Sequence, residues 1–299
     1  MDVVLTGAPL DFASVLRPGA RFGPRAVREA SQFFQSYSSA LGIDIFDELS
    51  AVDGGDVPEL GAEGSAALAT LATRAQEISS SGAIAGFIGG DQSVTLGALR
   101  GLREAKHKAF ALLHIDACSD TQNTAEKDRI CHRSVVRELL EAGLVRPNAV
   151  LQVGVRGPHT SVEEAGFAVA RGVEILGIDE VRWDLHSVVS AVRKLAGKGL
   201  LYVSVDVSAL DPSVAPGTSV PSPGGMSTWE LQQLLRALVG ADIVGFDVVE
   251  IAPSYDPAGI TALVGVTIVH EILAAIADTR RSGRPATTSR QGRGRRLSP

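Results

Sequence analysis

The chain has 299 residues, of which 45% are apolar and 21% charged, with a formal net charge of −6. This length suits one large domain or two small ones with an ample core, and the acidic balance argues against nucleic acid as the main partner. Two cysteines, Cys118 and Cys131, are too few for a disulfide framework and are expected to be reduced thiols.

Short apolar segments alternate with helical patterns along the chain. The strand candidates are residues 2–7, 43–47, 83–90, 110–116, 149–155, 173–178, 200–207 and 243–251. Their nearly continuous apolar residues are typical of strands that are covered on both faces. Amphipathic helical patterns occupy residues 23–34, 63–80, 134–143 and 227–240. The alternation predicts an α/β protein with a parallel sheet flanked by helices.

The two ends of the sequence are used to predict the domain organisation and the cellular location of the protein. We expect one domain over residues 1–280 and a basic, disordered tail over residues 281–299, which has almost no large apolar residues. The N-terminus lacks the regions of a signal peptide, and the longest apolar stretch, residues 259–269, is too short to span a bilayer. The sequence therefore predicts a soluble cytoplasmic protein with no membrane partner.

Polar residues follow four of the strand candidates, in residues 89–93, 114–120, 204–212 and 248–253. Ligands of open α/β sheets bind at the carboxyl ends of strands. Residues two apart on an extended segment share a side, so Asp116, Cys118 and Asp120 can converge. Clustered carboxylates repel one another unless a cation or protons neutralise them, which favours a divalent ion held by oxygen ligands. The alternative is that carboxylates cap helices or pair with Arg, and for Asp91 we prefer capping.

Several motifs together resemble the ureohydrolase superfamily, which contains arginase and agmatinase, and most closely its agmatinase branch. They are "RPGARFGPRAVREAS", "GGDQS", "HIDACSD", "LQVGVRG", "SVDVSALDPSVAPGTSVPSPGG" and "VVEIAP", and they cover nearly the whole predicted domain. The resemblance implies a three-layer α/β/α fold with a central, mostly parallel eight-stranded sheet. It also implies a homo-oligomer, a trimer or hexamer, in which two manganese ions activate the attack of hydroxide on a guanidinium carbon.

Three of the six metal-ligand positions implied by the resemblance are changed. Gln92 replaces the histidine of "GGDHS", Cys118 replaces that of "DAHxD", and Ser208 replaces the second aspartate of "DxD". Asp116, Asp120 and Asp206 match the family. With Gln92 these form an all-oxygen set for one ion, whereas the second ion would depend on Cys118, whose thiolate favours Zn²⁺. The substitutions favour one ion or none over two, with Mn²⁺ the expected metal.

Other residues match the family's catalytic pocket. His132 matches a proton-shuttling histidine, although Arg133 stands beside it where the family usually has Gly, and Asp120 is assigned to catalysis with it. Glu250 matches the carboxylate that pairs with the substrate guanidinium. These residues predict a hydrolase that cleaves a C–N bond of a small guanidino or amidino molecule.

Two other functions remain open from the sequence. One is a non-catalytic homologue that binds a guanidino ligand or partners an active subunit. The other is a repurposed biosynthetic enzyme whose chemistry is metal-free or depends on Cys118 as a nucleophile. In the hydrolase, residues 121–130 and 156–164 are the candidate substrate-specificity loops.

Overall fold

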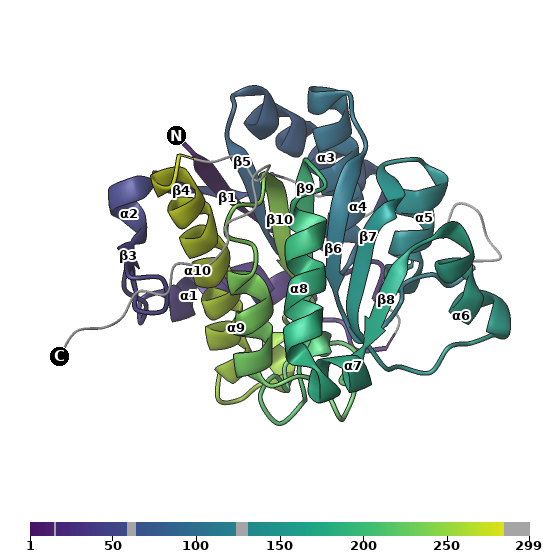
Figure 1. Ribbon diagram of the computed structural model, residues 1–299. Helices are drawn as coiled ribbons and strands as arrows, with labels where there is room; N and C mark the ends of the chain where they lie inside the picture. Colours follow the sequence, from purple (N-terminus) through teal and green to yellow (C-terminus); the bar gives the residue numbers. More distant parts are fainter. Residues whose placement is uncertain (15, 59–63, 124–130, 284–299) are drawn as a thin grey trace.

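The computed structural model describes residues 1–14, 16–58, 64–123 and 131–283 of the chain (Figure 1). At its centre lies an eight-stranded sheet with the strand order β4-β1-β5-β10-β9-β6-β7-β8, in which all neighbouring strands run parallel. These strands are β1 (Val3–Ala8), β4 (Ala51–Asp56), β5 (Ile84–Gly89), β6 (Phe110–Ile115), β7 (Val145–Val155), β8 (Glu174–Gly177), β9 (Leu201–Asp206) and β10 (Ile243–Val249). The predicted α/β architecture is confirmed.

Helices cover both faces of the sheet, each over its own apolar cluster. One cluster receives residues from α1 (Gly23–Ser31), α8 (Leu185–Ala196), α9 (Thr228–Arg236) and α10 (Ile260–Arg281). The other receives residues from α3 (Gly64–Ser80), α4 (Ser93–Lys106) and α5 (Val135–Glu141). Figure 1 shows α8, α9 and α10 across the near face of the sheet. The central strands are therefore buried on both sides, as their continuous apolar sequences predict.

Two segments at one edge of the sheet differ from the sequence prediction. Residues 43–47 are not a strand of the main sheet: β3 (Ile43–Asp44) pairs only with β2 (Tyr37–Ser38), and α2 (Ile45–Glu48) follows directly. Asp44 caps α2 by accepting a hydrogen bond from the Phe46 N–H. The strand that completes the sheet is β4, whose sequence "AVDGGD" is partly exposed and pairs with β1 at the edge.

The C-terminal helix α10 is the longest in the described part of the chain, with 22 residues. It is long and apolar enough to cross a membrane by length and composition, which residues 259–269 alone do not indicate. However, 78% of its most apolar window is buried inside the protein, so it is accounted for as a core helix. Residues 284–299, most of the predicted tail, lie outside the described residues.

The strand order determines where polar residues can meet. β5, β10, β9 and β6 are adjacent in the middle of the sheet, and each is followed by one of the four polar segments of the sequence. Because the strands are parallel, their carboxyl ends lie at one edge of the sheet. The fold thus brings the four segments together.

Candidate active site

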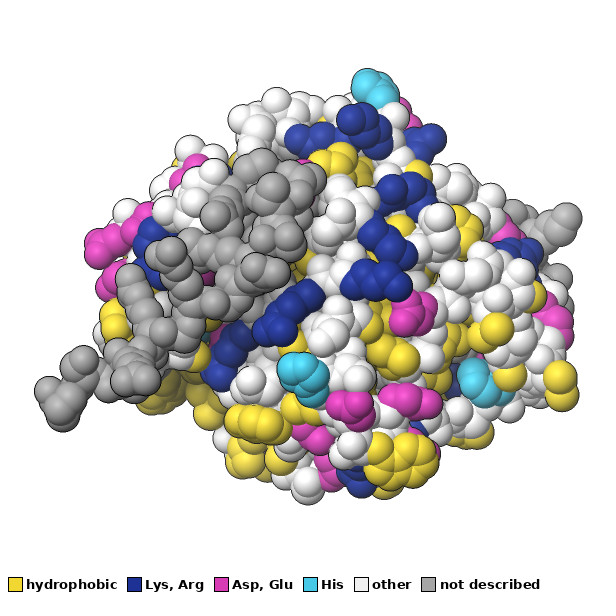
Figure 2. All heavy atoms as spheres, in the orientation of Figure 1, with side chains coloured by type: hydrophobic (Ala, Val, Ile, Leu, Met, Phe, Trp, Pro, Cys, Tyr) yellow, Lys and Arg dark blue, Asp and Glu magenta, His cyan; other side chains and the backbone are white. Residues whose placement is uncertain are grey.

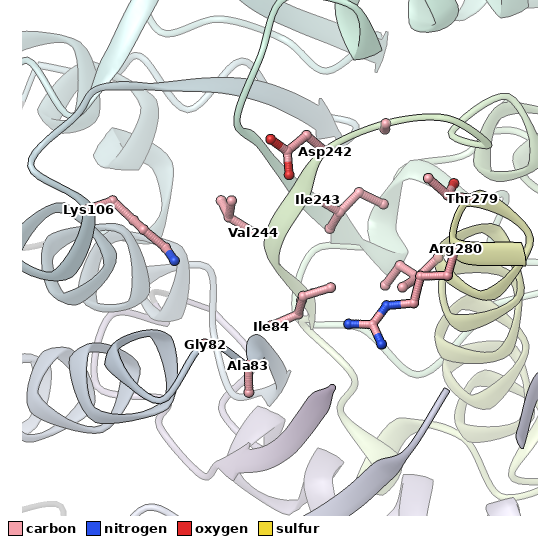
Figure 3. A pocket seen from close by; sticks show the side chains of 11 residues that line it. Gly82, Ala83, Ile84, Lys106, Asp242, Ile243, Val244, Thr279 and Arg280 are labelled. Carbon is pink, nitrogen blue, oxygen red and sulfur yellow. The ribbon is translucent and has the colours of Figure 1, made fainter. Parts of the chain in front are cut away.

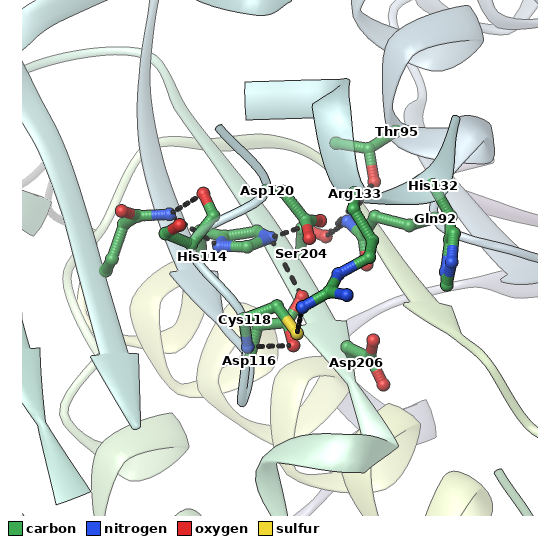
Figure 4. Close-up of polar contacts among 12 residues, drawn as sticks. Gln92, Thr95, His114, Asp116, Cys118, Asp120, His132, Arg133, Ser204 and Asp206 are labelled. Carbon is green, nitrogen blue, oxygen red and sulfur yellow. Dashed lines mark hydrogen bonds and ion pairs between the residues drawn. The ribbon is translucent and has the colours of Figure 1, made fainter. Parts of the chain in front are cut away.

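The residues predicted for the site gather at this edge. Gln92 follows β5, Cys118 and Asp120 follow β6, Asp206 ends β9 and Glu250 follows β10. One small cavity is lined by Gln92, Cys118, Asp120, His132, Arg133, Asp206, Ser208, Thr218, Val220 and Glu250. Asp116 joins this group through a hydrogen bond from Ser208. Every predicted site residue is therefore brought together, and Figure 4 labels all of them except Glu250.

Two of these residues have left-handed backbone conformations that non-glycine residues rarely adopt. Asp120 has a φ of 51° and Glu250 a φ of 64°. Such conformations cost free energy and are enriched at functional sites, where the surrounding contacts hold them. Both residues are almost fully buried, so these turns aim carboxylates into the cavity and not toward solvent.

One half of the site presents buried oxygen atoms that accept no hydrogen bond from the part of the chain that the structure describes. Within the described residues, Gln92 Oε1, Asp116 Oδ2 and Asp120 Oδ2 are buried and have no hydrogen-bond partner. The Gln92 amide is held by its nitrogen, which donates to Thr95 Oγ1 at 2.9 Å and Ser204 Oγ at 3.0 Å, so its oxygen remains free. Unpartnered buried acceptors are costly, and a hard divalent cation satisfies several of them at once. These residues fit one ion.

The other half of the site is closed by hydrogen bonds. Asp116 Oδ1 accepts from the Cys118 N–H at 2.8 Å and from Ser208 Oγ at 3.0 Å. Asp206 Oδ1 accepts from the Ser208 N–H at 2.6 Å. These donors take up part of the acceptor capacity of Asp116 and Asp206, and Ser208 brings a neutral hydroxyl in place of a carboxylate. The residues on this side do not fit a second ion.

The chemistry of Cys118 also argues against a second ion. Burial, together with the nearby charges of Asp116 and Asp120, raises the pKa of the Cys118 thiol above its usual range. A protonated thiol is a poor nucleophile, because the thiolate is the reactive form, and a metal ion would have to displace the thiol proton in order to bind. Cys118 and Cys131 do not form a disulfide, in agreement with the sequence prediction.

Crowding of carboxyl groups shifts their protonation. Burial raises the pKa of Asp116 to about 7, with a further contribution from the charge of Asp120. Burial likewise raises the pKa of Asp120 to about 7, and it raises that of Asp206 well above its usual value. The cluster binds protons tightly in the absence of a cation, and a bound cation would displace them.

Sequence reasoning missed His114, the first residue of "HIDACSD". His114, Asp116 and Asp120 offer ligand atoms within 4.8 Å of one another. The His114 Nε2 lies 3.4 Å from Asp116 Oδ2 and 3.6 Å from Asp120 Oδ2. Its position at the end of a buried strand, two residues before an aspartate, is the signal that could have identified it.

The contact with Gln152 sets the tautomer of His114, which determines whether Nε2 carries a hydrogen atom or a lone pair that could bind a metal ion. The Gln152 Nε2 donates to the Ser119 carbonyl at 2.7 Å and lies 3.1 Å from His114 Nδ1. The carbonyl fixes the amide orientation, so Gln152 donates to Nδ1 and the single proton of a neutral imidazole sits on Nε2. Burial lowers the pKa of His114, which keeps the ring neutral. The Nε2–H of His114 thus faces Asp116 and Asp120 but makes no hydrogen bond to either, and in this tautomer Nε2 is not a metal ligand.

Glu250 and His132 form the opposite wall of the cavity. The Glu250 carboxylate accepts from the Gln92 N–H at 3.0 Å and from the Ser219 hydroxyl, and its Oε1 lies 3.5 Å from His132 Nδ1. Burial lowers the pKa of His132, but the charges of Glu250 and its neighbours outweigh burial and raise it overall. His132 Nε2 is buried without a partner among the described residues, so it is available for proton transfer.

Asp91 has the structural role that its position predicts. Its carboxylate accepts hydrogen bonds from the Ala13 N–H at 2.8 Å and the Ser93 N–H at 3.0 Å at the start of α4. It therefore anchors the N-terminal segment to α4 and is not one of the ligand candidates.

A larger pocket of about 260 Å³ lies at the opposite edge of the sheet, beside the amino ends of β5 and β10 (Figure 3). Its charged groups are Lys106, Asp242 and Arg280, and Arg280 is paired with Asp2. These charges do not converge, and the pocket lies away from the carboxyl ends where ligands of α/β sheets bind. The candidate active site remains the smaller cavity.

Comparisons with known proteins agree with this geometry. The model of the arginase family matches residues 1–275. Proclavaminate amidinohydrolase of Streptomyces clavuligerus is 35% identical over 282 residues, which cover 94% of this chain and 90% of that one. Guanidinobutyrase of Pseudomonas aeruginosa is 32% identical over 278 residues, with coverage of 92% and 86%.

Solved structures match over the same extent. Proclavaminate amidinohydrolase superimposes with a TM-score of 0.88, over 93% of this chain and 92% of that one. Formiminoglutamase of Trypanosoma cruzi, solved with Mn²⁺, gives a TM-score of 0.84 at 22% identity, over 92% and 93% of the two chains. At that identity the second match shows the fold alone.

Proposed function

The chain belongs to the arginase family, and from this premise we propose that it is a ureohydrolase that acts on a small guanidino or amidino molecule through a single-ion site. The observation that carries the proposal is the set of three unpartnered buried oxygens on Gln92, Asp116 and Asp120, beside a second half closed by hydrogen bonds. Asp206 completes the set for one ion, and we propose Mn²⁺.

Each wall of the cavity has a distinct task in this proposal. A bound divalent ion supplies Lewis-acid activation of water. Glu250 pairs with the guanidinium of the substrate, because a carboxylate matches a planar cation through paired hydrogen bonds. His132 moves a proton through its free Nε2, and its raised pKa keeps it protonated nearer neutral pH. His114 Nε2 lies 3.4 Å from Asp116 Oδ2 and 3.6 Å from Asp120 Oδ2, and in this proposal its N–H helps to orient both carboxylates without a hydrogen bond to either.

The substrate class follows the relatives. Proclavaminate amidinohydrolase and guanidinobutyrase are named for amidino and guanidino compounds. Of the predicted specificity loops, residues 124–130 lie outside the described residues, whereas residues 156–164 lie beside the site, with Gly157 near Cys118. The Cys118-dependent alternative has less support, because burial keeps its thiol protonated.

We also propose a cytoplasmic homo-oligomer, a trimer or hexamer. Figure 2 shows a row of Lys and Arg side chains across the face over α8 and α9, with apolar side chains gathered at its lower edge. Trp183 ends α7 (Ile178–Trp183) and is 81% exposed, and Trp229 at the start of α9 is 59% exposed. Exposed aromatic side chains at a polar surface are typical of protein contacts.

The test of the proposed function is urea release. The protein loaded with Mn²⁺ is assayed with 4-guanidinobutyrate, agmatine and related guanidino compounds, beside the Asp116→Asn variant and the exposed control Asp47→Asn. We expect turnover of at least one compound, its loss in Asp116→Asn and its retention in the control. Full turnover by Asp116→Asn would overturn the metal-dependent proposal.

A further inference from the structure

Arg133 reaches into the site from the residue next to His132. Its Nη2 donates to Cys118 Sγ at 3.9 Å and to the Pro158 carbonyl at 3.3 Å. Figure 4 shows its guanidinium directed toward Cys118, on the side of the site that has lost its ligands. The chain therefore places a permanent positive charge beside one of the family's metal-ligand positions.

This guanidinium lacks the partners that an arginine usually has. Among the described residues, no carboxylate oxygen lies within salt-bridge distance of Arg133, and its buried Nε has no hydrogen-bond partner. Arg137, four residues later, pairs instead with both oxygens of Glu163. Arg133 thus makes no salt bridge to a described residue, and the carboxylates whose charges act on it are Glu164, beside the site, and Asp120, within it.

Arg133 also limits the space in the site. The cavity that it lines has a volume of about 10 Å³, which is about the room for one water molecule. A guanidinium always carries its charge, so Arg133 opposes any second cation nearby. The carboxylate of Asp120 attracts this guanidinium, as it would attract an ion.

We propose that Arg133 is a tethered cation that takes the place of the second metal ion on the Cys118 side of the site. Its charge offsets the carboxylate cluster and weakens the binding of any divalent cation to that cluster, including the single ion of the proposed function. This inference rests on the single-ion site of the proposed function. According to this inference, the charge of Arg133 disfavours a second ion in addition to the missing ligands.

The test compares Mn²⁺ affinity among variants by equilibrium dialysis and metal analysis. Arg133→Met keeps the length of the side chain without its charge, and we expect it to bind Mn²⁺ at least about tenfold more tightly. Arg133→Lys keeps the charge and should stay within about threefold of the parent protein. Arg74→Met removes an arginine of α3 remote from the cavity and should change nothing. Circular dichroism and thermal unfolding establish that all four proteins are folded.

Two results would overturn the inference. Equal Mn²⁺ affinity in the parent protein, Arg133→Met and Arg133→Lys would show that the Arg133 charge is not felt by the ion. An equal increase in Mn²⁺ affinity in Arg133→Met and Arg133→Lys would assign the effect to the shape of the side chain instead of its charge. If the parent protein binds one ion and releases urea, either result removes this inference alone. If no protein in the set binds Mn²⁺, the proposed function falls with it.

Discussion

The three substituted ligand positions have different consequences for the site. Gln92 keeps an oxygen free because its amide nitrogen is bound to two hydroxyl groups. Ser208, in contrast, donates hydrogen bonds from its hydroxyl to Asp116 and from its N–H to Asp206. Cys118 stays protonated and contacts Arg133. In the proposed single-ion site, one substitution therefore replaces a ligand, whereas the other two disfavour a second ion.

Restoring the family's residues should restore the second ion. We expect the triple variant Cys118→His/Ser208→Asp/Arg133→Gly to bind about two equivalents of Mn²⁺, because it regains an imidazole and a carboxylate and loses a competing charge. Metal analysis after removal of excess ion measures this. The matched double variant that retains Arg133 should bind less of the second ion. Identical stoichiometry in the triple variant and the parent protein would contradict this explanation.

Glu250 offers a direct test of substrate binding. Glu250→Gln keeps the shape of the side chain but removes the charge that pairs with a guanidinium, so KM should rise by at least about tenfold, equivalent to about 1.4 kcal/mol, with a smaller change in kcat. Steady-state kinetics on the best substrate measures both constants. The exposed control Glu174→Gln should be unchanged. An unaltered KM in Glu250→Gln would assign Glu250 to a structural role.

At the scale of elements, the sequence predicts what is locally encoded. Seven of the eight strands follow from continuous apolar runs, since a strand buried on both faces needs them. β4 was missed because "AVDGGD" has poor strand propensity and forms only through pairing with β1. Residues 43–47 look like a strand, but the cap of Asp44 starts α2.

The site shows the same division. Motifs identify which residues come together at the site, because the ends of the strands and the types of side chain that follow them can be recognised in the sequence. They do not reveal how the residues bond to one another: the Gln152 contact that sets the His114 tautomer joins β6 and β7 across 38 positions. The approach of Arg133 to Cys118 likewise depends on the folded loop. Local sequence patterns do not predict such contacts between segments that are distant in the chain.

The packing of α3 against α4 depends on a close approach at Gly101. A Cβ atom at Gly101 would lie 1.9 Å from the Ala72 carbonyl oxygen, a backbone atom that cannot turn away. Gly101→Ala should therefore lower the free energy of unfolding by about 1–3 kcal/mol. Urea denaturation measures this. The control Gly166→Ala meets no atom within 4 Å and should be neutral or stabilising by up to about 1 kcal/mol. Equal stability of the two variants would refute the packing argument.

At the scale of the whole molecule, the carboxylate cluster links stability to pH. The pKa values of Asp116 and Asp120 are raised by burial to about 7 in the folded protein, above their unfolded values. The folded state thus binds protons more tightly than the unfolded state, which adds to the free energy of unfolding. Without metal, this added stability is complete below about pH 4 and is lost as the pH rises to about 7. The ionised cluster above pH 7 is the form that binds a cation.

Metal should therefore stabilise the protein more strongly at high pH. We expect the increase in Tm on addition of Mn²⁺ to be larger at pH 8 than at pH 6, because protons compete with the ion below the pKa of the cluster. Thermal unfolding at both pH values, with and without Mn²⁺, measures the difference. In Asp116→Asn the increase should be largely lost at either pH. A larger increase at pH 6 would have the wrong sign for this linkage.

The central claim is a site for one ion, and metal content tests it most directly. The protein is purified without chelator, incubated with Mn²⁺, freed of excess ion and analysed by inductively coupled plasma mass spectrometry. The free oxygens of Gln92, Asp116 and Asp120, beside the closed contacts of Ser208, predict about one equivalent of Mn²⁺ per chain. Two equivalents, or none, would contradict the account.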